Sequence, residues 1–109
     1  MSRGVRESDW KAFRELRNIA LERLCARILG EVRTITRNET YGNHARYKQL
    51  WDLLRERDYD VARAFDDPRR SRMLLQLAAI HQLGLIEEDE FSRFHPETRR
   101  SVESLVQER

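Results

Sequence analysis

A helical pattern of unusual length, in residues 8–38, constrains the fold of this 109-residue chain more than any other feature. Apolar side chains recur there every three or four residues, which is the period of an α-helix, and no proline interrupts them. Ser8 is a suitable N-cap, and Asp9 suits the positive end of the helix dipole. The pattern therefore predicts one helix over residues 9–36. Its apolar positions are Trp10, Phe13, Leu16, Ala20, Leu24, Ile28, Val32 and Ile35.

This predicted helix is longer than the domain that would contain it. Residues 9–36 span about 42 Å at about 1.5 Å per residue. A compact domain of this size has a radius of gyration near ~13 Å, which corresponds to a sphere about 34 Å across. Either the helix bends, with Gly30 as its weakest point, or another subunit covers the overhang. We expect a continuous helix, bent at most near Gly30, and the overhang favours a homodimer.

The centre of this helix, residues 19–29, is the richest apolar stretch of the sequence. Leu21, Cys25 and Leu29 add a second apolar row along it. A wider apolar face is typical of a place where several helices converge, so we expect the other helices to pack here. In this interpretation Cys25 is a buried small hydrophobic residue and not a reactive thiol, which would need exposure and nearby positive charge.

Proline, glycine and turn residues divide the rest of the chain into shorter predicted helices. Asp67 is the expected cap of the third helix, with Pro68 at its first position, and Gly84 is its expected stop. We predict a flexible N-terminus in residues 1–8 and a single all-α domain in residues 9–109. The domain has four to five helices, with two long antiparallel helices followed by shorter ones. After the first helix, the expected ranges are 43 or 44 to about 65, about 68 to 83, a short helix whose first turn contains the acidic run 87–90, and a last helix from residue 96.

Charge is abundant but nearly balanced. The 21 basic and 19 acidic side chains leave a net charge of +2, which indicates a solvated, salt-bridged surface more than a concentrated nucleic-acid footprint. A single cysteine cannot form an intramolecular disulfide, which favours a reducing compartment. The sequence shows neither a leader-like apolar segment nor a run of about 20 apolar residues, so we expect a cytoplasmic protein without a membrane partner.

The sequence contains no recognised catalytic or metal-binding pattern. His44, His81 and His95 share no ligand spacing, and the acidic run 87–90 lacks the glycine and the alternating ligands of a calcium loop. Four scattered glycines cannot build a phosphate-binding loop. We therefore expect a protein that is not an enzyme and that needs no cofactor or metal.

Arginines form the first candidate binding surface. Those of the first helix spread around it at about 100° per residue, and glutamates alternate with them, which is typical of a solvated surface. Arg69, Arg70 and Arg72, near a helix start, are candidate anion-binding residues. Two adjacent aspartates would neutralise that site, so we prefer a cap with a salt-bridge cluster, with anion binding as the alternative. The arginines of the first helix are Arg14, Arg17, Arg23, Arg27, Arg33 and Arg37.

Aromatic side chains form the second candidate surface. Trp10, Tyr47 and Trp51 are candidate interface residues because Trp and Tyr are enriched in protein–protein hot spots, although both also fill cores. We expect a small helical protein that acts through protein–protein interaction or self-association. The alternative is a nucleic-acid or anion-binding accessory protein that uses the arginines of the first helix and of residues 69–72.

Overall fold

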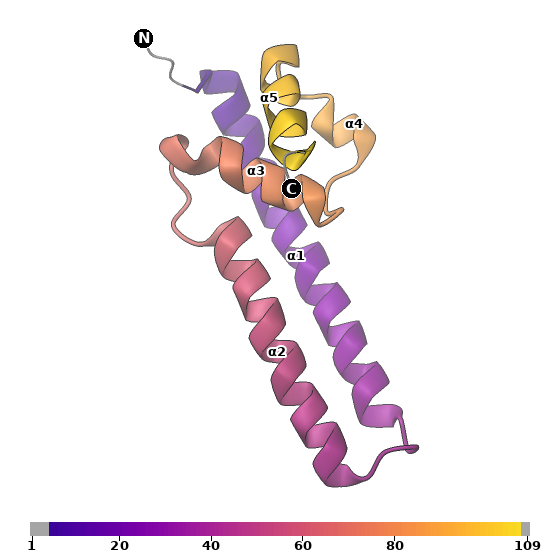
Figure 1. Cartoon of the computed structure of the whole chain (residues 1–109). Coiled ribbons are helices and arrows are strands. Elements are labelled where there is room, and N and C mark those ends of the chain that lie inside the picture. The colour runs from indigo at the N-terminus through magenta and orange to yellow at the C-terminus, as the bar shows by residue number, and fades with distance from the viewer. Residues whose placement is uncertain (1–4, 108–109) are drawn as a thin grey trace.

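Five α-helices and one short 3-10 helix make up the computed structural model, which describes residues 5–107 (Figure 1). No strand occurs among these residues. The predicted all-α fold, with two long helices followed by shorter ones, is confirmed. The elements are α1 (Glu7–Arg37), α2 (Asn43–Phe65), η1 (Arg70–Arg72, the 3-10 helix), α3 (Met73–Gln82), α4 (Glu88–Phe91) and α5 (Pro96–Gln107).

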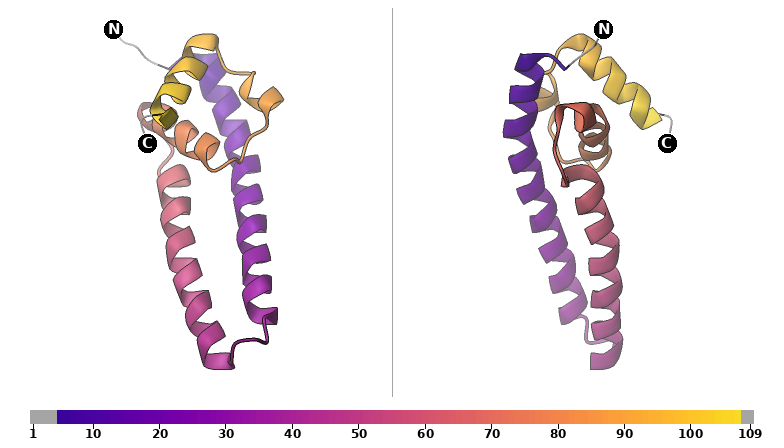
Figure 2. Two further views of the ribbon diagram at one scale, coloured as in Figure 1. Left: turned by 45° about the vertical axis from the view of Figure 1, so that its right-hand side comes forward. Right: turned by 90° about the vertical axis from the view of Figure 1, so that its left-hand side faces the viewer.

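α1 and α2 form an antiparallel hairpin that determines the shape of the molecule (Figure 1). The described chain measures 57 × 24 × 23 Å along its principal axes and has a radius of gyration of 16.7 Å. α3 crosses the hairpin near its open end, and α4 and α5 return beside the N-terminal half of α1 (Figures 1 and 2). α1 continues without a break through Gly30, and α2 runs along the part that overhangs the rest of the domain.

All buried side chains of the described chain lie at the open end of the hairpin. We call this end the head (residues 5–24 and 64–107) and the projecting hairpin the arm (residues 25–63). The arm contains no buried residue at all. The molecule therefore consists of a packed helical head and a two-helix arm. The largest buried hydrophobic side chains of the head include Phe13, Leu24, Phe65, Met73, Leu77, Ile80 and Phe94.

The prediction that the helices converge on residues 19–29 is correct for residues 20–24, where Ala20 and Leu24 are buried, and wrong beyond them. Burial along α1 ends at Leu24, and Cys25 and Leu29 are exposed. The physical reason is that the elements after α2 cover α1 only as far as Arg27. The segment that follows α3 lies beside Arg23 and Arg27, which donate hydrogen bonds to carbonyls of residues 85 and 83, and α1 projects beyond that point. The predicted burial of Cys25 is wrong for the same reason.

The start of α1 also differs from the prediction. α1 begins at Glu7, and Ser8 lies inside it. Its N-cap residue is Arg6, which has an extended backbone and makes no side-chain cap hydrogen bond. The predicted Ser8 cap is therefore wrong. Of the segment predicted to be flexible, residues 1–4 lie outside the described residues.

α3 begins at Met73 and not at Pro68, because the connector before it is not helical. Asp67 has a left-handed φ of 51°, and Arg69 is extended with φ of −140° and ψ of 160°. These two conformations separate Pro68 from the helix, so the predicted Asp67 cap is wrong. The predicted stop at Gly84 fits: this glycine has φ of 72° and lies in a Schellman turn, in which the next residue donates to the carbonyl of Ile80 at 3.2 Å.

A bidentate ion pair joins α4 to α1. Nη1 and Nη2 of Arg23 donate to the two carboxylate oxygens of Glu90 at 2.7 and 2.8 Å, and Arg23 also donates to the carbonyl of Leu85 at 2.9 Å. Glu90 in addition accepts the backbone N–H of Glu87 in a capping box. The hydrogen bonds from Arg23 and then from Glu87 lower the pKa of Glu90 from the usual 4.5 to about 2.

Acid should weaken the fold through Glu90. Its pKa is lower in the folded chain than in the unfolded chain, so its contribution is complete above about pH 4.5 and is lost as the pH falls toward 2. After allowance for solvent screening, we expect this contribution to be about 1–2 kcal/mol. Urea unfolding of the wild type and of Glu90→Gln from pH 6 to pH 2.5 measures it. The two stabilities should converge across this window, and a constant difference would contradict the assignment.

Candidate protein-interaction surface

One side of the arm carries a row of apolar side chains that recur at helical spacing on α2. Four of them, from residue 47 to residue 54, line a shallow groove of about 130 Å³. Ile28 of α1 joins Trp51 and Leu54 in a second groove of about 330 Å³, which continues the same surface toward the head. We call this surface the arm face and define it by Ile28, Tyr47, Leu50, Trp51, Leu54 and Val61.

Three side chains of the arm face are open to solvent, while Ile28, Leu50 and Val61 are half-buried. Tyr47 is 59% exposed, Trp51 54% and Leu54 44%. At this exposure an aromatic side chain leaves on the order of 100 Å² accessible. Adjacent residues of this kind approach the roughly 300–600 Å² of the largest apolar patch on a typical monomer, which is often functional. The indole N–H of Trp51 donates to the Tyr47 hydroxyl at 3.0 Å, so the polar group of Trp51 is satisfied within the surface.

Polar contacts hold α1 and α2 together and leave the arm face free. Arg57 of α2 forms a bidentate pair with Glu31 of α1, with both distances 2.9 Å. These hydrogen bonds lower the pKa of Glu31 and raise the pKa of Arg57. Nearer the tip, Arg46 donates to the carbonyl of Thr36 at 2.6 Å. The geometry of the arm thus rests on specific contacts within the hairpin, although no side chain of the arm is buried.

The three aromatic residues predicted for an interface do not lie together. Tyr47 and Trp51 share the arm face. Trp10 lies in the head, where its ring is stacked on Phe13 with centroids 5.7 Å apart and where the guanidinium of Arg70 lies 5.5 Å from its ring centre. Trp10 is half-buried and packs against the core. The structure therefore gathers two of the predicted residues into one surface and separates the third from them.

Carboxylates occupy the predicted anion-binding residues. Arg69 and Arg72 both form ion pairs with Asp67, and these contacts lower the pKa of Asp67, with the hydrogen bond from Arg69 as the largest cause. Arg70 forms an ion pair with Glu7 at 2.8 Å. An anion at this connector would have to compete with carboxylates for all three arginines.

The arginines of α1 divide into two groups. Three of them, Arg17, Arg23 and Arg27, donate to backbone carbonyls of the head, as in the 2.6 Å bond from Arg17 to Phe65. The others, Arg14, Arg33 and Arg37, form no ion pair within the described chain. The first group is thus structural, and the second does not form one continuous surface because Arg14 lies in the head.

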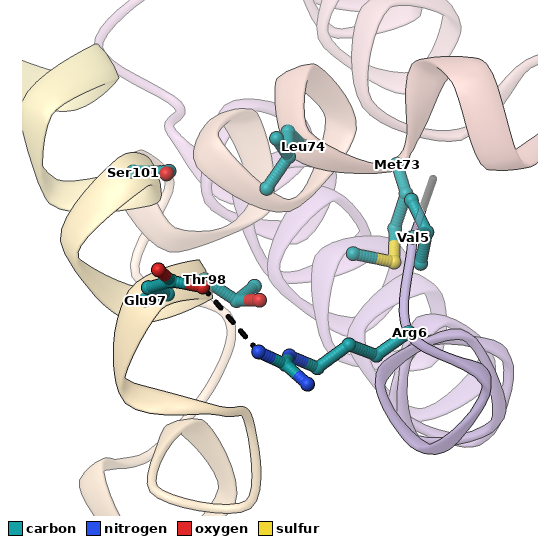
Figure 3. Close-up of a pocket in the computed structure, with 7 residues that line it drawn as sticks. All are labelled: Val5, Arg6, Met73, Leu74, Glu97, Thr98 and Ser101. Atoms are coloured by element: carbon teal, nitrogen blue, oxygen red, sulfur yellow. Dashed lines mark hydrogen bonds and ion pairs between the residues drawn. The ribbon is translucent and has the colours of Figure 1, made fainter. Parts of the chain in front are cut away.

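A groove of about 610 Å³ lies in the head, between the start of α1, α3 and α5 (Figure 3). Its polar groups are largely engaged. Arg6 pairs with Glu97 across it at 3.4 Å, and the Thr98 hydroxyl donates to Asp9 at 2.6 Å. Met73 and Leu74 supply the apolar part of its lining. Of the lining side chains, Arg6, Glu97 and Thr98 therefore already have partners within the described chain.

Two of the three histidines, His81 and His95, have structural positions. His81 packs against Phe91 with ring centroids 4.6 Å apart, and Nδ1 of His95 accepts the N–H of Glu97 as a cap of α5. Across the described residues, no group of three or more His, Cys, Asp or Glu side chains could hold a metal ion. Within the same residues, no helix is both long enough and apolar enough to cross a membrane.

Sequence reasoning missed most of the arm face as an exposed surface. The residues missed are Ile28, Leu50, Leu54 and Val61, whose helical spacing is the same as that of a buried face. Leu54 is exposed and the other three are only half-buried, because no third element lies over this side of the arm. A periodic pattern does not encode whether such an element is present. The available signal was the overhang of α1, because a helix that extends past its domain cannot have all of its apolar positions covered.

Comparison of the chain with protein-family models, with curated proteins and with solved structures found no match.

Proposed function

We propose that this protein acts through protein–protein interaction and that the arm face is its binding surface. The observation that carries the proposal is the contrast between the arm and the head: the arm contains no buried residue, yet it presents contiguous apolar side chains on one side. Burial of apolar area is the main favourable term in association, at roughly 25 cal/mol per Å². An exposed face of this kind has the most to gain from a protein partner.

The composition of the arm face supports the same proposal. Trp and Tyr are over-represented among the residues that dominate binding energy, and Trp51 and Tyr47 lie at adjacent helical turns with Leu54 beside them. A satisfied Trp51–Tyr47 hydrogen bond means that a partner could cover both rings without leaving the indole N–H unpaired. The alternative, anion or nucleic-acid binding through the arginines of α1 and of residues 69–72, has less support. The arginines of the connector already pair with carboxylates, and half of those in α1 donate to backbone carbonyls of the head.

A photo-crosslinking amino acid at Tyr47 should capture a protein. We expect Tyr47→benzoylphenylalanine, in the full chain expressed in cells, to give a discrete crosslinked product after irradiation, because this position would lie inside the interface. Glu56→benzoylphenylalanine is the matched control: Glu56 is exposed and nine residues away, which places it on the opposite side of α2. Gel electrophoresis and mass spectrometry would identify the product. Equal crosslinking at both positions, or none at Tyr47, would contradict the proposed function.

A further inference from the structure

We infer that the occupant of the arm face is a second copy of this chain, packed antiparallel so that the two arms form a four-helix bundle with a head at each end. This inference rests on the proposed function and names its partner. In such a dimer the same surface is used twice, related by a two-fold axis that crosses the arm near its middle. Such a dimer requires that each end of the arm face is complementary to its opposite end, because the two arms run in opposite directions.

The charge of α2 is self-complementary in this antiparallel sense. Residues 43–51 contain two bases and no acid, which gives a net charge of +2. Residues 52–60 contain four acids and two bases, which gives a net charge of −2. Two α2 helices that pack antiparallel therefore bring the basic half of each against the acidic half of the other. Electrostatic complementarity of this kind specifies register and orientation.

The parallel arrangement, with both heads at one end, is unfavourable for the same reason. Residues 33–48, which form the tip of the arm, contain four bases and one acid, a net charge of +3. A parallel pair would place two such tips side by side, and like charges in contact are repulsive. The antiparallel pair instead places each tip beside the acidic half of the partner's α2.

Two unpaired charges indicate the register. Of the seven charged side chains from Lys48 to Asp60, five take part in ion pairs within the described chain. The two that do not are Lys48 and Asp58, and both are exposed. Asp58 lines the same groove as Trp51 and Leu54. An antiparallel pairing centred near residue 53 places Lys48 of each copy opposite Asp58 of the other, so two symmetric ion pairs would flank the apolar contact.

The size of the surface fits a stable dimer. Residues 43–61 of α2 extend for about 28 Å, and two adjacent helices are about 20 Å wide, so one side of the arm has a projected area of roughly 560 Å². Its accessible area is larger than this projection, because the surface is ridged, and approaches the roughly 800 Å² that each partner contributes to a standard interface. The arm is thus long enough to form an interface without a contribution from the head.

Reversal of the two charges tests this dimer. Sedimentation equilibrium of the wild type should give a mass twice the 13.1 kDa of the chain. Lys48→Glu and Asp58→Lys should each weaken dimerisation at least about tenfold, because each places like charges in contact twice per dimer. The double variant Lys48→Glu/Asp58→Lys should restore dimerisation to within about threefold of the wild type, since the pairs are re-formed with reversed sign. Neither side chain forms an ion pair within the described chain, so helical circular dichroism should be unchanged in all three variants.

The possible failures are separable. A wild type that remains a monomer at high micromolar concentration would overturn the second copy as partner, while a Tyr47-specific crosslink to a different protein would leave the proposed function intact. A wild-type dimer whose mass is insensitive to both single reversals, or that the double variant fails to restore, would overturn the antiparallel register. Absence of any Tyr47-specific crosslink would overturn the proposed function as well.

Discussion

Leu77→Ala should lower the free energy of unfolding by about 2–5 kcal/mol, whereas Leu75→Ala should change it by no more than about 0.5 kcal/mol. Both leucines lie on α3, two residues apart, but Leu77 is 1% exposed in the core and Leu75 is 65% exposed. Truncation of Leu77 removes its burial and leaves a cavity, because neighbouring side chains relax only partly. Truncation of Leu75 removes atoms that already contact water.

Urea unfolding of the two variants, monitored by circular dichroism, measures this difference. The pair is matched in residue type, substitution and helix, so helix propensity cancels between them. Equal losses of stability in the two variants would contradict the packing of α3 in the head. A large loss for Leu75→Ala alone would show that the exposed side of α3 is covered in solution.

The existence of the helices could be predicted because local chemistry decides it. The three- and four-residue spacing from Trp10 to Ile35 predicts a single helix, and the observed α1 exceeds the predicted range by only two residues at its start and one at its end. The sequence predicts a second helix from residue 43 or 44 to about 65, and the structure has it as Asn43–Phe65. The stop at Gly84 was predictable for a similar reason, since a left-handed residue that ends a helix is most easily glycine.

The position of the core could not be predicted, because periodicity is the same in a buried face and in an exposed one. Phe13 and Leu16 in the head and Ile28 and Val32 in the arm all follow one helical pattern, yet only the first two are buried. What separates them is the docking of α3, α4 and α5 on the N-terminal part of α1. That docking depends on contacts between residues far apart in the chain, such as the one between Arg23 and Glu90.

The candidate site was predictable only in part, because residue type indicates a binding tendency but does not determine whether a side chain is covered. The aromatic character of Tyr47 and Trp51 identified them as interface candidates, and the structure places them together on an exposed face. Trp10 has the same character, but it lies where α3 and η1 meet α1, and Arg70 lies over its ring. Residue type alone did not distinguish the two settings. The predicted overhang of α1 indicated that one end of an unbent helix projects from the domain, but it did not identify which end.

Asp9→Ala should be among the most destabilising polar substitutions in the chain, at about 2–4 kcal/mol. The sequence shows Asp9 only as an acid in the first turn of a helix, but its side chain is 1% exposed. One carboxylate oxygen accepts the backbone N–H of His95 at 3.0 Å, and the other accepts the hydroxyl of Thr98 at 2.6 Å. Asp9 therefore binds the start of α5 from α1. Its removal leaves a backbone donor and a hydroxyl without their partner, and each such group costs about 1–3 kcal/mol.

A comparison of Asp9→Ala with Asp9→Asn and Thr98→Val separates these contributions. Asparagine retains an oxygen that can accept the His95 N–H, so Asp9→Asn should cost less than half as much as Asp9→Ala. The double variant Asp9→Ala/Thr98→Val should be less destabilised than the sum of the single variants, because the two side chains share one hydrogen bond. Hydrogen exchange should show faster exchange in α5 of Asp9→Ala, while the Glu31–Arg57 contact keeps the exchange rates of the arm unchanged. Additive losses, or exchange that rises equally in α5 and in the arm, would mean that Asp9 does not act as a local link between α1 and α5.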